Sequence, residues 1–360
     1  MKTDLKTCQL GIGASLSIAS IVLGLTITKP AAAKTVSMPS QIPSHDRFLE
    51  WCVDRPNLPS QTQHTLDVIL EKIETTDCDR ADAILSEMTE LNISAREISD
   101  LSPIASLPHL VRLDLSNNQI EDIAPIQSLT NLTHLFLADN QIYDVTPISA
   151  PNLVKLNLDN NQVADLSSLN PLTELKTLFL NNNQVTDLSP IESLAQMTTL
   201  FINNNQISNL QPLSSMVELR TLSLMNNQIE DIEPLQSMTQ MYELHLDGNQ
   251  ISDLSPLTSM SILNELYLSG NVIEDIYPLE NLKTVTELYI RDNQITDLTP
   301  LPEMLALNWA DFKNNQIADL EPIRQMETLV GIVLVDNPIA TESNNPTCPI
   351  DPESVCRFQE

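Results

Sequence analysis

The carboxylates are the side chains with the most obvious capacity for chemistry, because the chain holds 48 Asp and Glu against 18 Lys and Arg. Many recur every 21 or 22 residues in one column: Asp100, Asp122, Asp144, Asp165, Asp187, Asp231, Asp253, Asp275, Asp297 and Asp319. Asn209 replaces Asp in one interval. Such a column could bind divalent cations weakly, but Asp also favours Asx-type turns. We expect turn capping, with mutual repulsion raising the pKa of the stacked carboxyls.

Groups that could form a catalytic or metal site are dispersed along the chain. The five histidines are far apart: His45, His64, His109, His134 and His245. Only 6 Gly are present, and no Gly-rich phosphate loop, Cys-x-x-Cys pair or His cluster occurs. The sequence therefore predicts a protein that is not an enzyme and that has no cofactor and no metal site.

A repeat positions these side chains. The segment LFLNNNQVTDLSPIESL begins at Leu178, and similar segments begin at Leu113, Leu222 and Leu266. The last Asn of each copy lies 22 residues from the next, or 21 in one interval: Asn118, Asn140, Asn161, Asn183, Asn205, Asn227, Asn249, Asn271, Asn293, Asn315 and Asn337. One more copy precedes them, with Arg96 in the Asn position. Repetition at this period indicates a solenoid.

The residue types of the repeat predict its structure. In L-x-L the two leucines share one face of a short strand, and the x residue points the other way. Stacked copies then form a parallel sheet over one continuous apolar core. The Asn that follows can satisfy buried backbone groups of its own and the neighbouring coil. The Asp-Leu-x-Pro segment favours 3₁₀ turns over long helices.

The repeats resemble the 22-residue class of leucine-rich repeats, and most of all the internalin-type repeats of bacterial surface proteins. The resemblance covers about residues 91–339. It implies an α/β solenoid with short parallel strands on the concave face and mostly 3₁₀ turns on the convex face. Intracellular phosphatase-regulator scaffolds have similar repeats and are an alternative, which the export features below oppose.

Residues 1–33 are predicted to be a secretory leader. Lys2 and Lys6 give a basic start, an apolar stretch follows, and an Ala triplet precedes Lys34. An uncleaved membrane anchor is the alternative. With cleavage, we expect a secreted or periplasmic protein that is not inserted in a membrane.

The ends of a solenoid need lids, because they would otherwise expose the leucine column. Residues 34–90 should supply a Pro/Ser-rich lead-in and a helical N-terminal cap, with apolar patterns typical of helices at 65–73 and 81–88. Residues 340–360 should form the C-terminal cap.

The four cysteines that follow the leader are predicted to form disulfides: Cys52, Cys78, Cys348 and Cys356. Three pairings are possible for four cysteines. Coils stacked at about 4.8 Å separate the two ends of the array by roughly 50 Å, whereas the Cα atoms of bonded cysteines lie within about 7 Å. We therefore expect one disulfide within each cap.

The net charge of −30 limits the partners. So acidic a surface repels phosphate backbones and anionic lipid heads, and a nucleic acid is excluded as a partner. We expect a monomer that binds a protein or peptide. We further expect that partner to carry basic groups.

Two columns of outward strand residues are free for recognition, since core packing does not fix them. The residue between the two leucines defines the aromatic column: Asp114, Phe136, Asn157, Phe179, Phe201, Ser223, His245, Tyr267, Tyr289 and Asp311. The residue two positions earlier defines the charge column: Arg112, His134, Lys155, Thr177, Thr199, Thr221, Glu243, Glu265, Glu287 and Trp309. Exposed strands favour Thr and aromatic residues in general, but this preference does not explain three successive Glu.

The C-terminal half of these columns is the predicted binding site. Its residues are Glu243, His245, Glu265, Tyr267, Glu287, Tyr289 and Trp309. Like charges on adjacent strands are destabilising, and nothing in the repeat requires Glu there. A site over Phe136, Phe179 and Phe201, nearer the basic end, is one alternative. A structural cell-envelope protein with weak cation binding is another.

Overall fold

The computed structural model describes residues 45–339 and 347–359, which belong to one compact unit. The predicted leader (1–33), the lead-in (34–44) and part of the predicted C-terminal cap (340–346) lie outside the described residues. Expectations for those segments therefore stay predictions.

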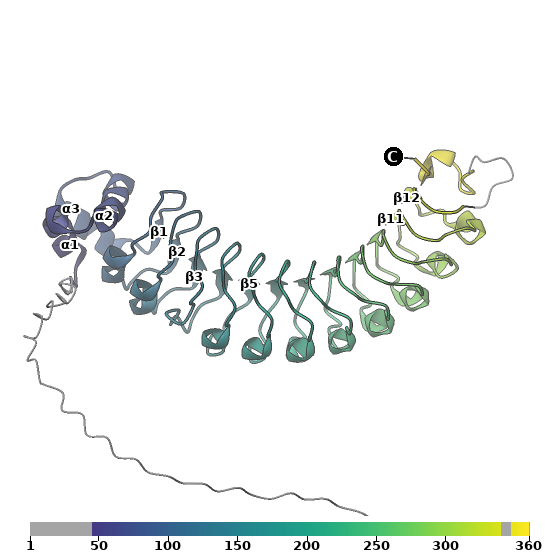
Figure 1. The fold of residues 1–360 in the computed structure, drawn as a ribbon, viewed down its shortest axis with the longest axis horizontal. Helices are drawn as coiled ribbons and strands as arrows, with labels where there is room; N and C mark the ends of the chain where they lie inside the picture. Colours follow the sequence, from purple (N-terminus) through teal and green to yellow (C-terminus); the bar gives the residue numbers. More distant parts are fainter. Residues whose placement is uncertain (1–44, 340–346, 360) are drawn as a thin grey trace, which may run out of the picture. The chain divides into compact units, whose positions relative to one another are not determined.

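The strands form one open parallel sheet whose order follows the sequence, on the inner side of the curved repeat array (Figure 1). The predicted solenoid with short parallel strands is thus confirmed. The 13 strands are β1 (Glu90–Asn92), β2 (Arg112–Asp114), β3 (His134–Phe136), β4 (Lys155–Asn157), β5 (Thr177–Phe179), β6 (Thr199–Phe201), β7 (Thr221–Ser223), β8 (Glu243–His245), β9 (Glu265–Tyr267), β10 (Glu287–Tyr289), β11 (Trp309–Asp311), β12 (Gly331–Val333) and β13 (Cys356–Arg357).

The middle residue of each three-residue strand is buried and stacks on its counterpart in the next coil. Leu200, for example, pairs in register with Leu178 and Leu222, and all three are fully buried. Methionines that take a Leu position are also buried in this core: Met197, Met216, Met238, Met260 and Met326. Each side chain buried in this way contributes roughly 1.5–3 kcal/mol.

The repeated Asn turns inward, as its place after the strand predicts. The side-chain nitrogen of Asn205 lies 2.9 Å from the carbonyl of Leu180 in the preceding coil and 3.3 Å from that of Ile202 in its own coil. Its side-chain oxygen accepts a hydrogen bond from the amide of Val185 at 2.9 Å. One buried amide therefore satisfies backbone groups of two coils, and this arrangement recurs along the array.

The outer side of the array is made of 3₁₀ helices, as predicted. They are η2 (Ser102–Ser106), η3 (Ala124–Ser128), η4 (Ser167–Leu169), η5 (Ser189–Ile191), η6 (Gln211–Ser215), η7 (Glu233–Leu235), η8 (Ser255–Ser259), η9 (Tyr277–Asn281), η10 (Leu301–Glu303) and η11 (Glu321–Gln325). The coil between β3 and β4, which is one residue shorter, has turns instead of a 3₁₀ helix.

The Asp column caps the turns that lead into these helices. Asp122 accepts a hydrogen bond from the amide of Ala124 at 2.7 Å, and Asn209 accepts one from Gln211 at 2.9 Å, so Asn performs the same task. The prediction of raised pKa values is wrong for Asp165, whose pKa is lowered by hydrogen bonds from the hydroxyl and amide of Ser167. These bonds stabilise the carboxylate more than desolvation destabilises it. The pKa of Asp187 is lowered by Ser189 in the same way.

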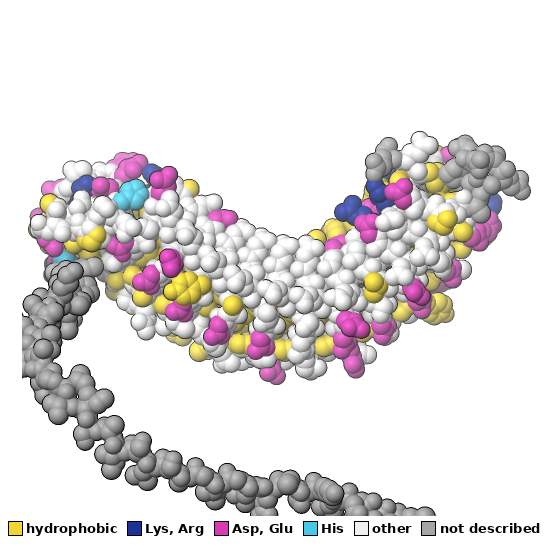
Figure 2. All heavy atoms as spheres, in the orientation of Figure 1, with side chains coloured by type: hydrophobic (Ala, Val, Ile, Leu, Met, Phe, Trp, Pro, Cys, Tyr) yellow, Lys and Arg dark blue, Asp and Glu magenta, His cyan; other side chains and the backbone are white. Residues whose placement is uncertain are grey.

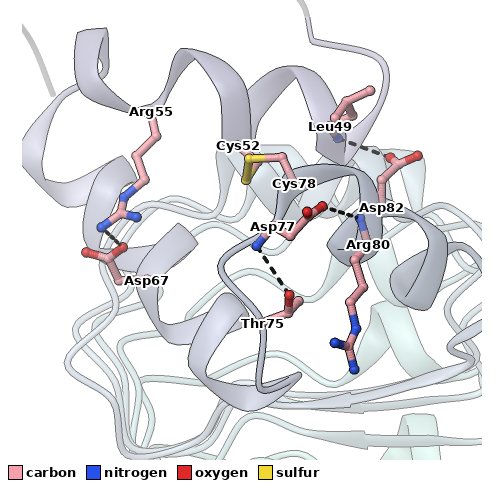
Figure 3. Close-up of a disulfide and its surroundings, with 9 residues drawn as sticks. All are labelled: Leu49, Cys52, Arg55, Asp67, Thr75, Asp77, Cys78, Arg80 and Asp82. Carbon is pink, nitrogen blue, oxygen red and sulfur yellow. Dashed lines mark hydrogen bonds and ion pairs between the residues drawn. A yellow bond between two sulfur atoms is a disulfide. The ribbon is translucent and has the colours of Figure 1, made fainter.

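The N-terminal cap consists of α1 (Phe48–Asp54), η1 (Arg55–Asn57), α2 (Ser60–Lys72) and α3 (Cys78–Glu87). Helices α2 and α3 confirm the two predicted from apolar spacing. Helix α1 was missed by that analysis; it packs on α3, and the Cys52–Cys78 disulfide joins them (Figure 3). Beside this disulfide, Asp82 accepts a hydrogen bond from the amide of Leu49.

The C-terminal cap extends the sheet. Strand β13 pairs in parallel with β12, placing Cys356 opposite Ile332. The predicted Cys348–Cys356 disulfide is formed and fixes this strand to the short segment before η12 (Glu353–Val355). The pairing covers the edge that β12 would otherwise expose, and it brings Arg357 onto the inner face of the sheet.

Candidate functional site

The parallel register aligns each outward column across the sheet. In the charge column Glu243 pairs with Glu265, and Glu265 with Glu287. In the aromatic column Tyr267 pairs with Tyr289. All five side chains are half-buried on the inner face. The structure therefore brings most of the predicted site together.

Six residues of β8, β9 and β10 form what we call the acid–aromatic cluster: Glu243, His245, Glu265, Tyr267, Glu287 and Tyr289. Its three rings stack face to face. The centroids of His245 and Tyr267 are 4.1 Å apart and their planes differ by 12°. Those of Tyr267 and Tyr289 are 4.6 Å apart and differ by 4°. The stack follows directly from the strand register, because each strand contributes one ring.

Hydrogen bonds connect each ring to the carboxylate of its own strand. They join His245 Nε2 to Glu243 Oε1 (2.7 Å), the Tyr267 hydroxyl to Glu265 Oε2 (3.0 Å) and the Tyr289 hydroxyl to Glu287 Oε2 (2.8 Å). Residues two apart on a strand point to the same face, so the two columns are coupled within every strand.

The environment of the stack holds both tyrosines in the protonated form. Burial raises the pKa of Tyr267, and the hydrogen bond to Glu265 raises it further. Burial also raises the pKa of Tyr289 to about 12, with further contributions from the Glu287 hydrogen bond and the nearby carboxylates. At neutral pH both hydroxyls are therefore donors to carboxylates.

These bonds correct the expectation that nothing in the repeat requires Glu in the charge column. Each Glu accepts a hydrogen bond from an aromatic residue, and this offsets part of the repulsion between neighbouring carboxylates. The two tyrosine hydroxyls and His245 Nε2 are consequently engaged within the cluster. What the cluster presents outward is the rim of the stack and the remaining carboxylate oxygens.

Trp309 lies beyond the stack. Its ring occupies the space above Gly331, where any Cβ would collide with the indole. The guanidinium of Arg357, from the C-terminal cap, lies over this ring, 4.8 Å from its centroid. Trp309 is therefore a contact between the sheet and the cap, and sequence analysis could not find Arg357 as its partner because the strand that carries it was not predicted.

The basic end of the sheet holds a second aromatic group. Phe179 and Phe201 stack with centroids 5.3 Å apart. The guanidinium of Arg112 lies 4.5 Å from the centroid of Phe136, and the ammonium of Lys155 lies 5.1 Å from that of Phe179. In this half, cations of the chain itself already cover aromatic faces.

A small residue separates the two aromatic groups. Ser223 lies between Phe201 and His245 in the aromatic column and is almost fully buried. Its hydroxyl donates a hydrogen bond to Asn203 Oδ1 at 2.7 Å. The inner face thus divides into a Phe half with basic residues and a Tyr half with acidic ones.

A third outward column, which sequence analysis did not single out, runs along the ends of the strands. Asp159, Asn181 and Asn203 each accept a hydrogen bond from the backbone amide at the same position of the next coil. Asp247 accepts the backbone amide of Ser269 in the same way, at 2.9 Å. Burial raises the pKa of the Asp247 carboxyl. The recurring Asn, Asp and Ser at this position were the available signal.

Charged side chains are distributed unevenly over the surface in Figure 2. Acidic groups follow the outer face, and a group of Lys and Arg lies near the inner edge of the C-terminal coils. Within residues 45–339 and 347–359, no three His, Cys, Asp or Glu side chains are arranged to hold a metal ion. No helix in the same part of the chain is long and apolar enough to span a membrane.

The fold and the stacked outward columns define a leucine-rich repeat solenoid. The family model for leucine-rich repeats (2 copies) matches residues 86–128, 130–171, 173–215, 217–259 and 263–303. The structure is similar to internalin InlF of Listeria monocytogenes, with a TM-score of 0.73 and 30% identity over 78% of this chain and 86% of that chain. The chain therefore belongs to the leucine-rich repeat family, with repeats of the internalin type.

Two further structures share the fold at lower identity. InlJ of Listeria monocytogenes, described as containing a cysteine ladder, has a TM-score of 0.63 and 21% identity over 87% of this chain and 70% of that chain. The plant peptide hormone receptor RGFR1, solved in complex with RGF2, has a TM-score of 0.60 and 15% identity over 72% of this chain and 49% of that chain. No curated protein sequence matches the chain. Leucine-rich repeat proteins are generally protein-binding modules, and the internalin-like fold is typically not enzymatic.

Proposed function

We propose that this chain is an exported, non-enzymatic binding module that recognises a protein or peptide on the inner face of its sheet, over the acid–aromatic cluster. The observation that carries this proposal is the cluster itself. Three stacked rings and three hydrogen-bonded carboxylates occupy strand positions that the solenoid core leaves free.

The physical case rests on rigidity and composition. Stacking and hydrogen bonding hold Tyr267 and Tyr289 in place before any partner arrives, so little side-chain entropy is lost on binding. Tyrosine is also among the residues that contribute most to interface hot spots. The half-buried Glu residues favour a partner with basic groups, because complementary charges speed association and select partners.

Export is supported by the caps. Disulfides Cys52–Cys78 and Cys348–Cys356 suit an oxidising compartment rather than a bacterial cytosol. Together with the leader-like residues 1–33, they favour a secreted or periplasmic protein, acting as a monomer. N-terminal sequencing of the mature protein should begin near Lys34, and retention of the leader in the purified protein would contradict export by cleavage.

The Phe half is the second candidate site, since Phe136, Phe179 and Phe201 also face outward. The rings of Phe136 and Phe179, however, already contact Arg112 and Lys155. A partner there would have to displace these cations or bind above them. We therefore place the primary site in the Tyr half.

Two double variants distinguish the halves. Serine is compatible with the aromatic column, because Ser223 occupies it in the native chain. Tyr267→Ser with Tyr289→Ser should abolish capture of a partner from envelope extract, whereas Phe179→Ser with Phe201→Ser should retain it. Circular dichroism would verify that both variants are folded. Capture that survives the Tyr pair and fails with the Phe pair would move the site to the Phe half. Capture unaffected by either pair would favour a structural envelope role.

A further inference from the structure

Among the described residues, no ring or cation lies over the outer face of Tyr289, at the C-terminal end of the stack. Tyr267 is covered on both faces, by His245 and by Tyr289. Tyr289 has Tyr267 on one side only, because the next residue in the aromatic column is Asp311. The stack therefore ends with a tyrosine face opposite a carboxylate.

Other aromatic faces of this sheet show what such an environment attracts. Phe136 has the guanidinium of Arg112 at 4.5 Å, Phe179 has the ammonium of Lys155 at 5.1 Å, and Trp309 has the guanidinium of Arg357 at 4.8 Å. Over residues 45–339 and 347–359, no Lys or Arg lies over the ring of Tyr289. Three carboxylates, those of Glu287, Glu265 and Asp311, nonetheless act electrostatically on Tyr289.

Unused acceptors surround this face. Glu287 accepts the Tyr289 hydroxyl through Oε2, and among the described residues no donor reaches its Oε1. Asp311 accepts the amide of Lys313 through Oδ1 at 3.0 Å, a bond that does not involve its second oxygen, Oδ2. Both carboxylates are close enough to the tyrosine to raise the pKa of its hydroxyl electrostatically. Arg291, two residues after Tyr289, pairs instead with Asp292 at 3.8 Å.

We propose that the space between Tyr289 and Asp311 is a subsite for one cationic side chain of the partner, with arginine preferred. This inference rests on the proposed function, and it specifies the chemistry of the group that is recognised. A guanidinium could lie flat on the outer face of Tyr289 while donating to Asp311 Oδ2 and Glu287 Oε1. A planar, multiply donating cation suits this combination better than the compact ammonium of lysine.

The chain offers a matched pair of variants for the test. Asp311→Asn removes the charge and keeps the turn, because Asn157 in the same column accepts the corresponding amide of Asp159 at 2.8 Å. Asp319→Asn removes one charge from the outer face of the same region and keeps its turn, because Asn209 caps the equivalent turn. The two variants therefore have the same net charge and differ in where the charge is lost.

The probe is N-acetyl-arginine amide, titrated into the mature protein with ¹³C-labelled tyrosine and followed by NMR. We expect selective shifts of the Tyr289 ring, weaker binding of the lysine analogue and no shift with the norleucine analogue. Asp311→Asn should weaken arginine binding about fivefold, whereas Asp319→Asn should leave it unchanged.

Absence of a Tyr289 shift, or equal weakening by both Asn variants, would overturn the subsite. These results are separable from the proposed function, which is judged by partner capture with the Tyr267 and Tyr289 variants. Capture that depends on the tyrosines, without an arginine response at Tyr289, would leave the binding module intact and remove only the subsite. An arginine response at Tyr289 without tyrosine-dependent capture would support the subsite and refute the binding module.

Discussion

The ring of Tyr267 lies on that of Tyr289, with centroids 4.6 Å apart and planes that differ by 4°, and each hydroxyl donates to a Glu of its own strand. The two residues are register partners on β9 and β10. Aromatic pairs of this kind contribute about 0.5–1.5 kcal/mol beyond their buried area. The inner face of the solenoid is therefore organised before a partner binds.

Titration of the tyrosines tests this organisation. The pKa of Tyr289 is raised to about 12 and that of Tyr267 is also raised, so the folded protein keeps protons that the unfolded chain loses near pH 10. Their contribution to stability is present below about pH 10 and is lost as the pH rises through the folded pKa. The tyrosinate absorbance of the wild type should include a late step that is missing after Tyr267→Phe with Tyr289→Phe. Identical titration curves would refute the hydrogen-bonded stack.

The buried Asn is expected to be the most sensitive polar position of the repeat. Asn205→Ala would leave the buried amide of Val185 without a partner, and the carbonyl of Leu180 would keep only its bond from Asn183, which should cost about 2 kcal/mol in total. Asn204→Gly is the control, because Asn204 has a φ of 55° and Gly248 occupies the equivalent position with a φ of 66°. Chemical denaturation should show a large loss for Asn205→Ala and a change within about 0.5 kcal/mol for Asn204→Gly. Equal losses would contradict the role of the ladder.

The caps should depend on their disulfides independently. On the loop-entropy model, the Cys52–Cys78 bond with its separation of 26 residues contributes about 3.5 kcal/mol, and the Cys348–Cys356 bond with its separation of 8 contributes about 2.5 kcal/mol. Because each repeat contacts mainly its neighbours, the loss should be local. Hydrogen exchange of a Cys52→Ser, Cys78→Ser variant should increase in α1 to α3 and the first coils. Uniform destabilisation of the array, or peptide mapping that joins the two caps, would be inconsistent with this account.

Acid stability should reflect the hydrogen bonds of the Asp column. The folded pKa of Asp165 is lowered, so its contribution to stability is present above the unfolded value and is lost as the pH falls through the folded value. Ser167→Ala removes the hydroxyl whose hydrogen bond contributes most to the lowered pKa of Asp165. The pKa of Asp165 should therefore rise toward its ordinary range. Ser168→Ala is the control, since the Ser168 hydroxyl donates to the carbonyl of Val145 instead. Carboxyl NMR titration would measure both, and an unchanged pKa in Ser167→Ala would mean that another contact sets it.

Much of the fold could be predicted because each structural role is filled by the same residue types in many copies of the repeat. The strands, the inward Asn and the 3₁₀ turns all follow from residue types at fixed spacing. Strand β13 and helix α1 could not be predicted in this way, because each occurs once, outside the repeat. The pKa direction in the Asp column also required the structure, since the decisive hydroxyl of Ser167 lies beside Asp165 only in the folded turn.

The candidate site was predictable in composition but not in contacts. Register alone places Tyr267 beside Tyr289 and Glu265 beside Glu287. Sequence could not show that the rings stack closely, or that their hydroxyls bind the carboxylates. It also could not show that Trp309 turns toward the cap, because this depends on the space over Gly331 and on Arg357.

The most direct test of the binding proposal is the affinity of the captured and purified partner for three forms of the mature protein. The wild type should bind it, and Tyr267→Ser with Tyr289→Ser should weaken binding by at least about 30-fold, as loss of a hot-spot residue worth about 2 kcal/mol implies. Phe179→Ser with Phe201→Ser should change the affinity by less than about threefold. Affinity retained in the Tyr variant and lost in the Phe variant would contradict the central claim.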